Sequence, residues 1–345
     1  MVEPPRTQQR SHRRRDTGAR ASAVLISVLL ALFYAWTVEI RTNQPYSTDF
    51  AKFHASARYF VQGGDIYAEV PWDAYGGLPE GFDSKRRSMP PNLNPPLQTL
   101  LFVPLAHASY ASGFRLWSAL SIVMAVIAVW VAARAVAIGG TVPRRTFLFG
   151  LALFVYFPTW VCIVFGQLGL LLLLLVALGW SAARRGRVWT AGLVLGLGLA
   201  LKPFLGLFLV LFLLLRKWRL SLATLVAFLA FTGIGLVVMG LEPHLRYLEI
   251  LGRVDWYFPR WNGSAMGFWT RIFGGGAFQP LVDMPGLAQV LGLASFGFGL
   301  VVLAVLARLL RDLGETTRLD LATALTLLLT MFMSPLGWIY PIFPR

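Results

Sequence analysis

Apolar stretches of helical length recur along most of this chain, and short clusters of basic residues separate them. The first stretch runs from Ala21 to Ile40, which is about the 20 residues that a helix needs to cross a bilayer. Further stretches of the same kind cover residues 114–137, 146–163, 166–183, 188–201, 203–215, 220–241, 287–310 and 319–334. The pattern therefore predicts an all-α integral membrane protein with about nine transmembrane helices.

Basic residues decide how residues 188–215 are divided, because this stretch fits either one long helix or two short ones. Arginine and lysine cluster at 184–187 and again at 216–219, on either side of it. Both clusters favour the cytoplasmic side of the membrane. Two helices with an outer turn near Lys202 satisfy both clusters, and Pro203 can end the first helix at that turn.

The same rule orients the whole chain. The polar, Arg-rich residues 1–20 are predicted to form a disordered cytoplasmic tail, and residues 21–345 a polytopic transmembrane domain. Most of the 31 basic residues then lie on the cytoplasmic side, whereas most of the 16 acidic residues lie outside. A cleaved signal peptide is the alternative for the first stretch. Its long apolar run, with no small-residue cleavage site after it, favours a retained anchor.

Two long loops, residues 41–112 and 242–286, face outward in this arrangement. Both are rich in aromatic residues, glycine and proline. The first loop is predicted to begin with an amphipathic interfacial helix over about residues 50–62, and to contain a second surface helix that starts at a Pro-Pro pair at 95–96. Because the inner connections are short, we expect the function of this protein to lie on the outer face.

Composition agrees with a membrane protein, since 57% of the residues are hydrophobic and only 14% are charged, against about 25% in a typical soluble domain. The net charge of +15 does not indicate nucleic-acid binding, because the basic residues fall between apolar stretches. Cys162 is the single cysteine, so no intrachain disulfide can form. The sequence has no nucleotide-binding, zinc-binding or serine-hydrolase motif, and we expect no cofactor and no metal.

Asp49 is the candidate for chemistry on the outer face. It follows the first span by a few residues and precedes the helix predicted from Phe50. A carboxylate in this position can act as a general base. Aspartate is also favoured as the cap of a helix N-terminus, so a structural role is the alternative. Asp49 together with Asp65 or Asp73 could in addition hold a divalent ion.

Several short motifs occur in an order that resembles a known family. They are Ser47-Thr48-Asp49-Phe50, Asn94-Pro95-Pro96-Leu97, Phe165-Gly166-Gln167-Leu168-Gly169-Leu170, Ala200-Leu201-Lys202-Pro203, Arg216-Lys217-Trp218-Arg219 and Ser334-Pro335-Leu336-Gly337-Trp338. From about residue 21 to 340 the chain resembles membrane glycosyltransferases of the C fold. Among them it is similar to glycosyltransferase family 87, which includes the polyprenyl-phosphate-mannose-dependent mannosyltransferases of actinobacteria.

The chain departs from the pattern of that family at two places. Asn94 stands where an aromatic residue often precedes the Pro-Pro pair, and Ile339-Tyr340 stand where a histidine often follows the tryptophan. Another helix is expected beyond Arg345, so the chain is predicted to be truncated at its C-terminus.

The resemblance implies a hexosyltransferase that moves a sugar, mannose first of all, from a polyprenyl-phosphate donor to a glycolipid or polysaccharide acceptor on the outer face of the cell membrane. Asp49 is then the general base of an inverting displacement. The leaving phosphate needs cations to hold it, and Lys202 is the first candidate. Further candidates for binding phosphate or substrate are His54, Arg58, Gln167, Arg246, Arg260 and Asn262.

These side chains also have simpler interpretations. Lys202 can extend to the membrane interface, Gln167 and Asn262 can hold turns, and His54 can be an ordinary surface residue.

Two other functions stay open. A transporter or flippase for a lipid-linked substrate fits the many spans and the interrupted helices near Lys202. Against it, charged residues within the spans are almost absent and no internal repeat is visible. The other alternative is an inactive relative that serves as an assembly partner. The expected partners are the lipid-linked sugar donor, the acceptor and membrane lipids, and not nucleic acid.

Overall fold

The computed structural model describes residues 6–44, 48–71, 88–89, 91–136, 139–253, 257, 262–274 and 280–334. Helices dominate this part of the chain, which confirms the predicted all-α class. Its strands are two short ones, β1 (Val70–Pro71) and β2 (Ser88–Met89), which pair antiparallel within the first loop.

Each apolar stretch predicted from the sequence is helical. The corresponding helices are α1 (Arg6–Thr42), α4 (Tyr110–Ala135), α5 (Val142–Val155), α6 (Phe157–Val164), α7 (Gly169–Arg184), α8 (Val188–Leu201), η4 (Pro203–Gly206), α9 (Leu207–Leu214), α10 (Trp218–Met239), α13 (Pro285–Leu309), η5 (Leu310–Asp312) and α14 (Glu315–Met333). The two loops add α2 (Asp49–Val61), α3 (Pro96–Phe102), η3 (Val103–Leu105), α11 (Glu242–Gly252) and α12 (Ala265–Phe273). The first loop therefore forms helices, α2 and α3, at the two places where the sequence predicted them.

The start of α1 differs from the expectation. The sequence predicted a disordered tail over residues 1–20, whereas residues 6–20 are helical. Arginine, glutamine and alanine all favour helix, and the long apolar helix that follows removes the cost of nucleation. The part that is long and apolar enough to cross a membrane is Arg20–Thr42, close to the predicted span.

Four helices of the described residues are long and apolar enough to span a bilayer, namely Arg20–Thr42, Tyr110–Ala135, Trp218–Met239 and Pro285–Asp312. The pair α5 and α6 makes a fifth if it counts as one broken span. The chain is thus a multi-pass membrane protein. The shorter apolar helices α7, α8 and α9 do not reach the length of a straight span, so the count of nine stays a prediction.

The bend between α5 and α6 explains why one predicted span appears as two helices. The two axes meet at 69°, and the break is at Tyr156, whose backbone is extended. Pro158 lies in the first turn of α6, where a missing N–H costs nothing. The proline therefore ends one helix and starts the next.

Large apolar side chains face outward along the spans. Examples are Leu32 on α1, Val237 on α10 and Leu293 on α13, which are 61%, 87% and 68% exposed. Exposure of this extent over whole helices would be unfavourable in water, but it is what a lipid environment requires. The membrane therefore covers these faces.

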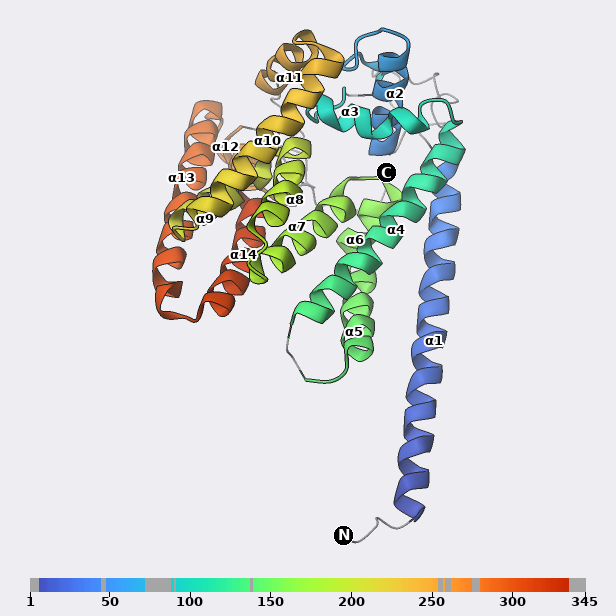
Figure 1. The fold of residues 1–345 in the computed structure, drawn as a ribbon. Helices are drawn as coiled ribbons and strands as arrows, with labels where there is room; N and C mark the ends of the chain where they lie inside the picture. The colour runs from blue at the N-terminus through green and yellow to red at the C-terminus, as the bar shows by residue number, and fades with distance from the viewer. Residues whose placement is uncertain are drawn as a thin grey trace.

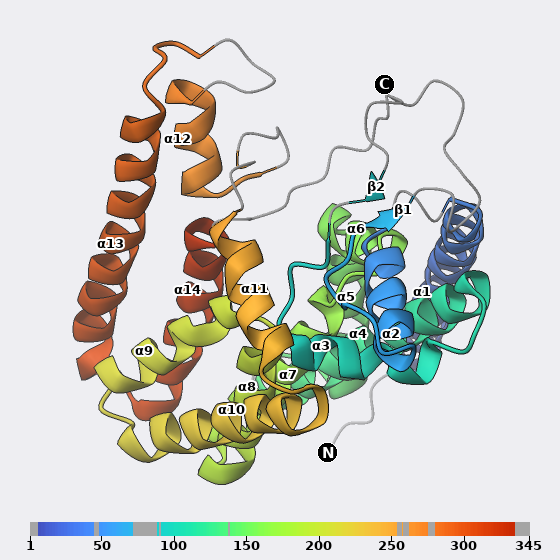
Figure 2. The same ribbon diagram turned by 90° about the horizontal axis from the view of Figure 1, so that it is seen from above.

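Figures 1 and 2 show how the helices are arranged. The loop helices α2, α3 and α11 gather at one end of the molecule, at the top of Figure 1. The C-terminal end of α4 and the turn between α13 and α14 lie toward the opposite end. In both views α1 and α13 are on opposite sides of the bundle, with α7 and α8 between them. The loop helices α2 and α3 thus sit over the spans at one end.

Two glycines let α8 and α10 approach closely. A Cβ at Gly192 would lie 2.4 Å from the Cβ of Ala223, and one at Gly196 would lie 2.5 Å from the Cβ of Ala227. Small residues spaced four apart are the usual means by which helices pack in membranes. This contact fixes the position of α8, whose C-terminal end carries Lys202.

Candidate functional site

The N-terminus of α2 presents Asp49. Thr48 is the cap of this helix, and its hydroxyl accepts a hydrogen bond from the backbone N–H of Ala51 at 3.2 Å. The same hydroxyl lies 2.7 Å from the hydroxyl of Tyr110 on α4, which ties the start of α2 to the bundle. The capping bond thus comes from Thr48, and the carboxylate of Asp49 makes its contacts elsewhere.

Two of those contacts are with Lys52 and Gln167. Lys52 places its Nζ 2.9 Å from Oδ1 of Asp49, and Gln167 donates from its Nε2 to Oδ2 at 2.9 Å. The side chains of Asp49 and Lys52 keep 19% and 23% of their surface exposed. The carboxylate is therefore held in a fixed orientation but stays accessible from one side.

The turn between α6 and α7 brings Gln167 to this position. Gly166 has φ +64°, and a Cβ on it would lie 2.5 Å from the Cβ of Phe50. Trp117 donates from its ring nitrogen to the carbonyl of Gly166 at 2.9 Å. The backbone N–H of Phe50 bonds the carbonyl of Phe165 at 3.1 Å. The turn and α2 are thus joined backbone to backbone, which sets the distance from Gln167 to Asp49.

A cluster of aromatic rings supports this junction. Phe50 is fully buried, and its ring contacts those of Phe102, Tyr110 and Phe114 edge to face, with centroids 5.6–5.9 Å apart. Buried aromatic pairs of this geometry add about 0.5–1.5 kcal/mol each beyond their area. The first turn of α2 is therefore rigidly seated.

Lys202 lies in the turn between α8 and η4, outside both helices. Burial lowers the pKa of Lys202 to about 8, while the negative charge of Asp49 raises it and the positive charge of Lys52 lowers it. The ammonium of Lys202 is therefore close enough to interact electrostatically with the charges of Asp49 and Lys52. Its ammonium is charged below about pH 8 and becomes neutral as the pH rises through that value.

His54 faces away from Asp49. The two residues are five apart on α2, which turns their side chains about 140° from each other. His54 is fully buried, and its Nε2 lies 3.1 Å from the carbonyl of Ala108. Burial lowers the pKa of His54, so the imidazole is neutral at pH 7 and donates to that carbonyl. Its contacts are those of a core residue.

Arg58 is exposed further along α2, beside a hollow of about 410 Å³ that Gln62, His107 and Ser109 also line. It is nine residues beyond Asp49, so the two side chains lie on opposite faces and about 13 Å apart along the helix axis. The structure therefore does not bring Arg58 to the carboxylate.

Arg246 and Asn262 are engaged in other contacts. Arg246 on α11 pairs with Glu249 at 2.6 Å and with Asp65 at 3.8 Å. Asn262 is fully buried before α12, where it donates to the carbonyl of Tyr257 at 3.0 Å and accepts from the N–H of Ser264 at 3.2 Å. Helix α12 lies far from α2 in both views (Figures 1 and 2).

Arg260 and Asp73 lie outside the described residues. The carboxylate of Asp65 accepts from the N–H of Tyr67 at 2.9 Å and pairs with Arg246. Within the described residues there is no group of three or more His, Cys, Asp or Glu side chains that could hold a metal ion.

Lys52 is the site residue that sequence reasoning missed. The sequence did indicate that Lys52 is close to Asp49, because a residue three positions later on a helix lies on the same face. It was overlooked because the sequence does not show which side chains surround that face.

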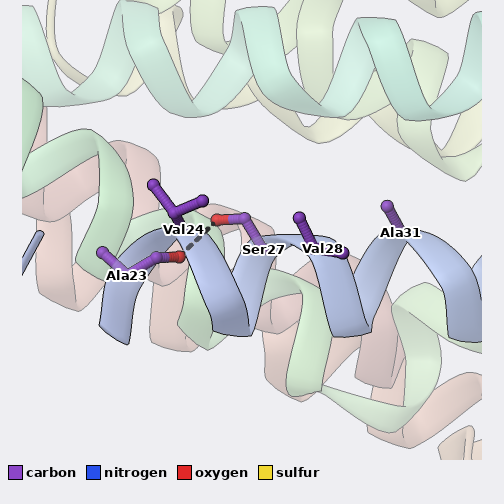
Figure 3. A pocket seen from close by; sticks show the side chains of 5 residues that line it. All are labelled: Ala23, Val24, Ser27, Val28 and Ala31. Carbon is purple, nitrogen blue, oxygen red and sulfur yellow. Dashed lines mark hydrogen bonds between the residues drawn. The ribbon is translucent and has the colours of Figure 1, made fainter. Parts of the chain in front are cut away.

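A second hollow, of about 350 Å³, lies along α1 at a distance from this site. Figure 3 shows its lining side chains, Ala23, Val24, Ser27, Val28 and Ala31, with the hydroxyl of Ser27 bonded to the carbonyl of Ala23 at 2.9 Å. It contains no charged group, and its middle is roughly 20 Å along the helix from the end of α1. A shallow apolar hollow of this kind on a span is a surface for lipid chains.

Comparison with known proteins agrees with the resemblance seen in the sequence. The profile of glycosyltransferase family 87 matches residues 92–335. The polyprenol-phosphate-mannose-dependent alpha-(1-2)-phosphatidylinositol pentamannoside mannosyltransferase of Mycobacterium tuberculosis is 27% identical over 328 residues, which are 92% of this chain and 69% of that protein.

The alpha-(1->3)-arabinofuranosyltransferase of the same species is 29% identical over 219 residues, which are 61% of this chain and 47% of that protein. The chain thus spans about half the length of this second relative. No solved structure matches the chain.

Proposed function

This chain belongs to glycosyltransferase family 87, and on that premise we propose that it transfers a sugar from a polyprenyl-phosphate donor to a glycolipid or polysaccharide acceptor, with Asp49 as the general base. The donor's polyprenyl tail stays in the bilayer, and its phosphate reaches the site beside the first turn of α2. A lipid-linked donor suits a protein whose loop helices sit directly over its spans.

The reaction is a single displacement. The acceptor hydroxyl oxygen attacks the anomeric carbon while the bond from that carbon to the phosphate oxygen breaks, and polyprenyl phosphate leaves with the bonding electrons. The hydroxyl proton passes to the carboxylate of Asp49. The side chains described around Asp49 include Lys52, Gln167, Cys162 and Lys202, none of which is a second carboxylate. A retaining double displacement would need a nucleophile about 5 Å away, so inversion is favoured.

Lys202 stabilises the leaving group in this proposal. Breaking the bond to the sugar turns a phosphodiester with one negative charge into a phosphomonoester with up to two, and a fixed cation nearby lowers the barrier to that change. Gln167 keeps the carboxylate oriented by its hydrogen bond to Oδ2.

Mannose is the proposed sugar, on the strength of the longer match. The mannosyltransferase relative aligns with 92% of this chain and the arabinofuranosyltransferase with 61%. We propose further that the site faces the outer side of the membrane, because the basic clusters at the opposite end of the spans favour the cytoplasmic side.

One observation carries the proposal: at the start of α2 a partly exposed carboxylate, held by Gln167, pairs with Lys52 and interacts electrostatically with Lys202. The test uses purified protein in liposomes with radiolabelled polyprenyl-phosphate mannose and a glycolipid acceptor. Asp49→Asn should lower turnover by about 10²- to 10⁴-fold, the usual contribution of a general base.

Asp283→Asn is the matched control, since it makes the same chemical change at an exposed acid in the second loop. It should leave turnover unchanged. Thermal unfolding should be similar in both variants. Full turnover in Asp49→Asn would refute the role of this carboxylate, and movement of lipid-linked sugar without product would support a transporter instead.

A further inference from the structure

Lys52 is a cation at the site to which the proposed sugar transfer gives no role. Lys52 lies one turn after Asp49 on α2, with its ammonium 2.9 Å from Oδ1. Resting on the proposed function, we propose that Lys52 exchanges its ion pair with Asp49 for the phosphate of the polyprenyl-phosphate donor, so that donor binding itself releases the general base.

The pair between Lys52 and Asp49 is of a kind that breaks readily. Both side chains are partly exposed, at 23% and 19%, and ion pairs in contact with solvent add little to stability. Lysine carries its charge on a flexible four-carbon chain. The ammonium can therefore swing from one anion to another without moving the helix.

The charges at the site favour a second anion. Within the described residues, Lys52 contacts the carboxylate of Asp49 and Lys202 interacts with it electrostatically, so these groups carry more positive than negative charge. The N-terminal end of the 13-residue helix α2 adds a partial positive charge at the same place. A phosphate that gains negative charge as the sugar departs matches two ammonium groups better than one.

The exchange also changes the carboxylate. An ammonium in contact with a carboxylate stabilises its ionised form and weakens it as a base. When Lys52 moves to the phosphate, Oδ1 gains proton affinity, while Gln167 continues to hold Oδ2. The titratable groups that the described structure places near Asp49 include Lys52 on α2, Lys202 at the end of α8 and Cys162 on α6. Of these, Lys52 is the one in direct contact by an ion pair.

The experiment compares Lys52→Met, which removes the charge, with Lys52→Arg, which keeps it. The first readout is binding of polyprenyl phosphate without a sugar to each protein in detergent. The second is the pH dependence of kcat and of kcat/KM for the sugar-bearing donor. Arg253→Gln, at an exposed arginine on the outer end, is the control for loss of one positive charge.

Lys52→Met should weaken polyprenyl phosphate binding and raise the KM for the donor by about tenfold or more, because a charge-assisted contact is lost. The acidic side of the pH profile of kcat/KM reports protonation of Asp49 in the free enzyme. It should move to higher pH in Lys52→Met. The acidic side of the pH profile of kcat reports the complex with the donor. It should move much less, since in that complex Lys52 has already left the carboxylate of Asp49. Lys52→Arg should restore most of the binding, and Arg253→Gln should resemble the wild type.

Two results would overturn the exchange. One is unchanged polyprenyl phosphate binding in a folded Lys52→Met protein. The other is an equal shift of the acidic sides of both pH profiles, which would make Lys52 a fixed partner of Asp49. Absence of sugar transfer by the wild type is a different failure, because it refutes the proposed function while the phosphate-binding measurement still tests Lys52.

Discussion

Gly166 is the residue on which the geometry of the site depends most directly. Its left-handed backbone, with φ +64°, turns the chain so that Gln167 points to Asp49. The space of a side chain is taken by Phe50 and Phe114, whose atoms would lie 2.5 and 3.2 Å from a Cβ. Both the conformation and the close contact thus require glycine at this position.

Gly166→Ala should therefore reduce both stability and activity. The left-handed backbone costs about 1–2 kcal/mol for alanine, and the clash with Phe50 adds about 1–3 kcal/mol. Gly186→Ala is the matched control, because Gly186 has φ +69° and nothing within 4 Å of its Cβ position. Thermal unfolding in detergent should show the larger loss for Gly166→Ala, with loss of sugar transfer only in that variant. Equal losses would mean that the contact with Phe50 is unimportant.

The site residues were only partly predictable from the sequence. Asp49, Gln167 and Lys202 were chosen from separate motifs, and the structure brings all three together. His54 was also chosen, yet it is buried against the carbonyl of Ala108. Which face of α2 is buried depends on the aromatic cluster around Phe50, and that cluster is formed by residues distant in the sequence. A single helix pattern cannot supply this information.

At the scale of elements, the contact between α8 and α10 positions the second half of the site. Lys202 follows the last residue of α8 directly, so any shift of α8 along α10 moves the lysine relative to Asp49. Close packing of small residues is how helices recognise each other in lipid, where the hydrophobic effect does not drive association. The glycines of α8 thus affect the site although they do not line it.

Gly192→Ala should destabilise the protein by about 1–3 kcal/mol, because its Cβ would lie 2.6 Å from a backbone carbon of Ala223, which cannot move independently. Gly233→Ala on α10 meets nothing within 4 Å and should be neutral or stabilising by about 0.5–1 kcal/mol. The unfolding temperature should fall for Gly192→Ala and should stay the same or rise for Gly233→Ala. A stable Gly192→Ala protein with normal turnover would contradict the proposed importance of this contact.

Helix positions and the break at Lys202 were well predicted, whereas the bend at Tyr156 was not. The apolar stretches gave the helices to within a few residues, because hydrophobic length is a strong signal. The 69° bend at Tyr156 was missed. A proline such as Pro158 is compatible either with a kinked continuous helix or with two separate helices, and the sequence does not decide between them. The helical course of residues 6–20 was missed as well, because composition alone does not include the influence of the helix that follows.

At the scale of the whole molecule, ion pairs join the helices at the end opposite to α2. Asp320 on α14 accepts from the ring nitrogen of Trp180 at 2.8 Å and pairs with Arg184 at 3.4 Å, both on α7. Lys217, at the start of α10, pairs with Glu315 at 2.6 Å. The basic clusters that predicted a cytoplasmic position therefore also connect α14 to the rest of the bundle.

The proposed orientation has a direct test by chemical labelling. Gln62→Cys, at the exposed end of α2, should react with a membrane-impermeant maleimide on intact cells. Arg185→Cys, in the exposed turn after α7, should react only after permeabilisation. The wild type, with Cys162 alone, gives the background. The reverse pattern would place α2 in the cytoplasm and rule out an outer-face reaction.

The wide separation of the site residues along the chain has a consequence for biosynthesis. Asp49 and Lys52 leave the ribosome early, whereas Gln167 and Lys202 follow more than one hundred residues later. A nascent chain halted before α8 enters the bilayer would contain Asp49, Lys52 and Gln167 but not Lys202. The proposed site is thus completed only when the turn after α8 is in place.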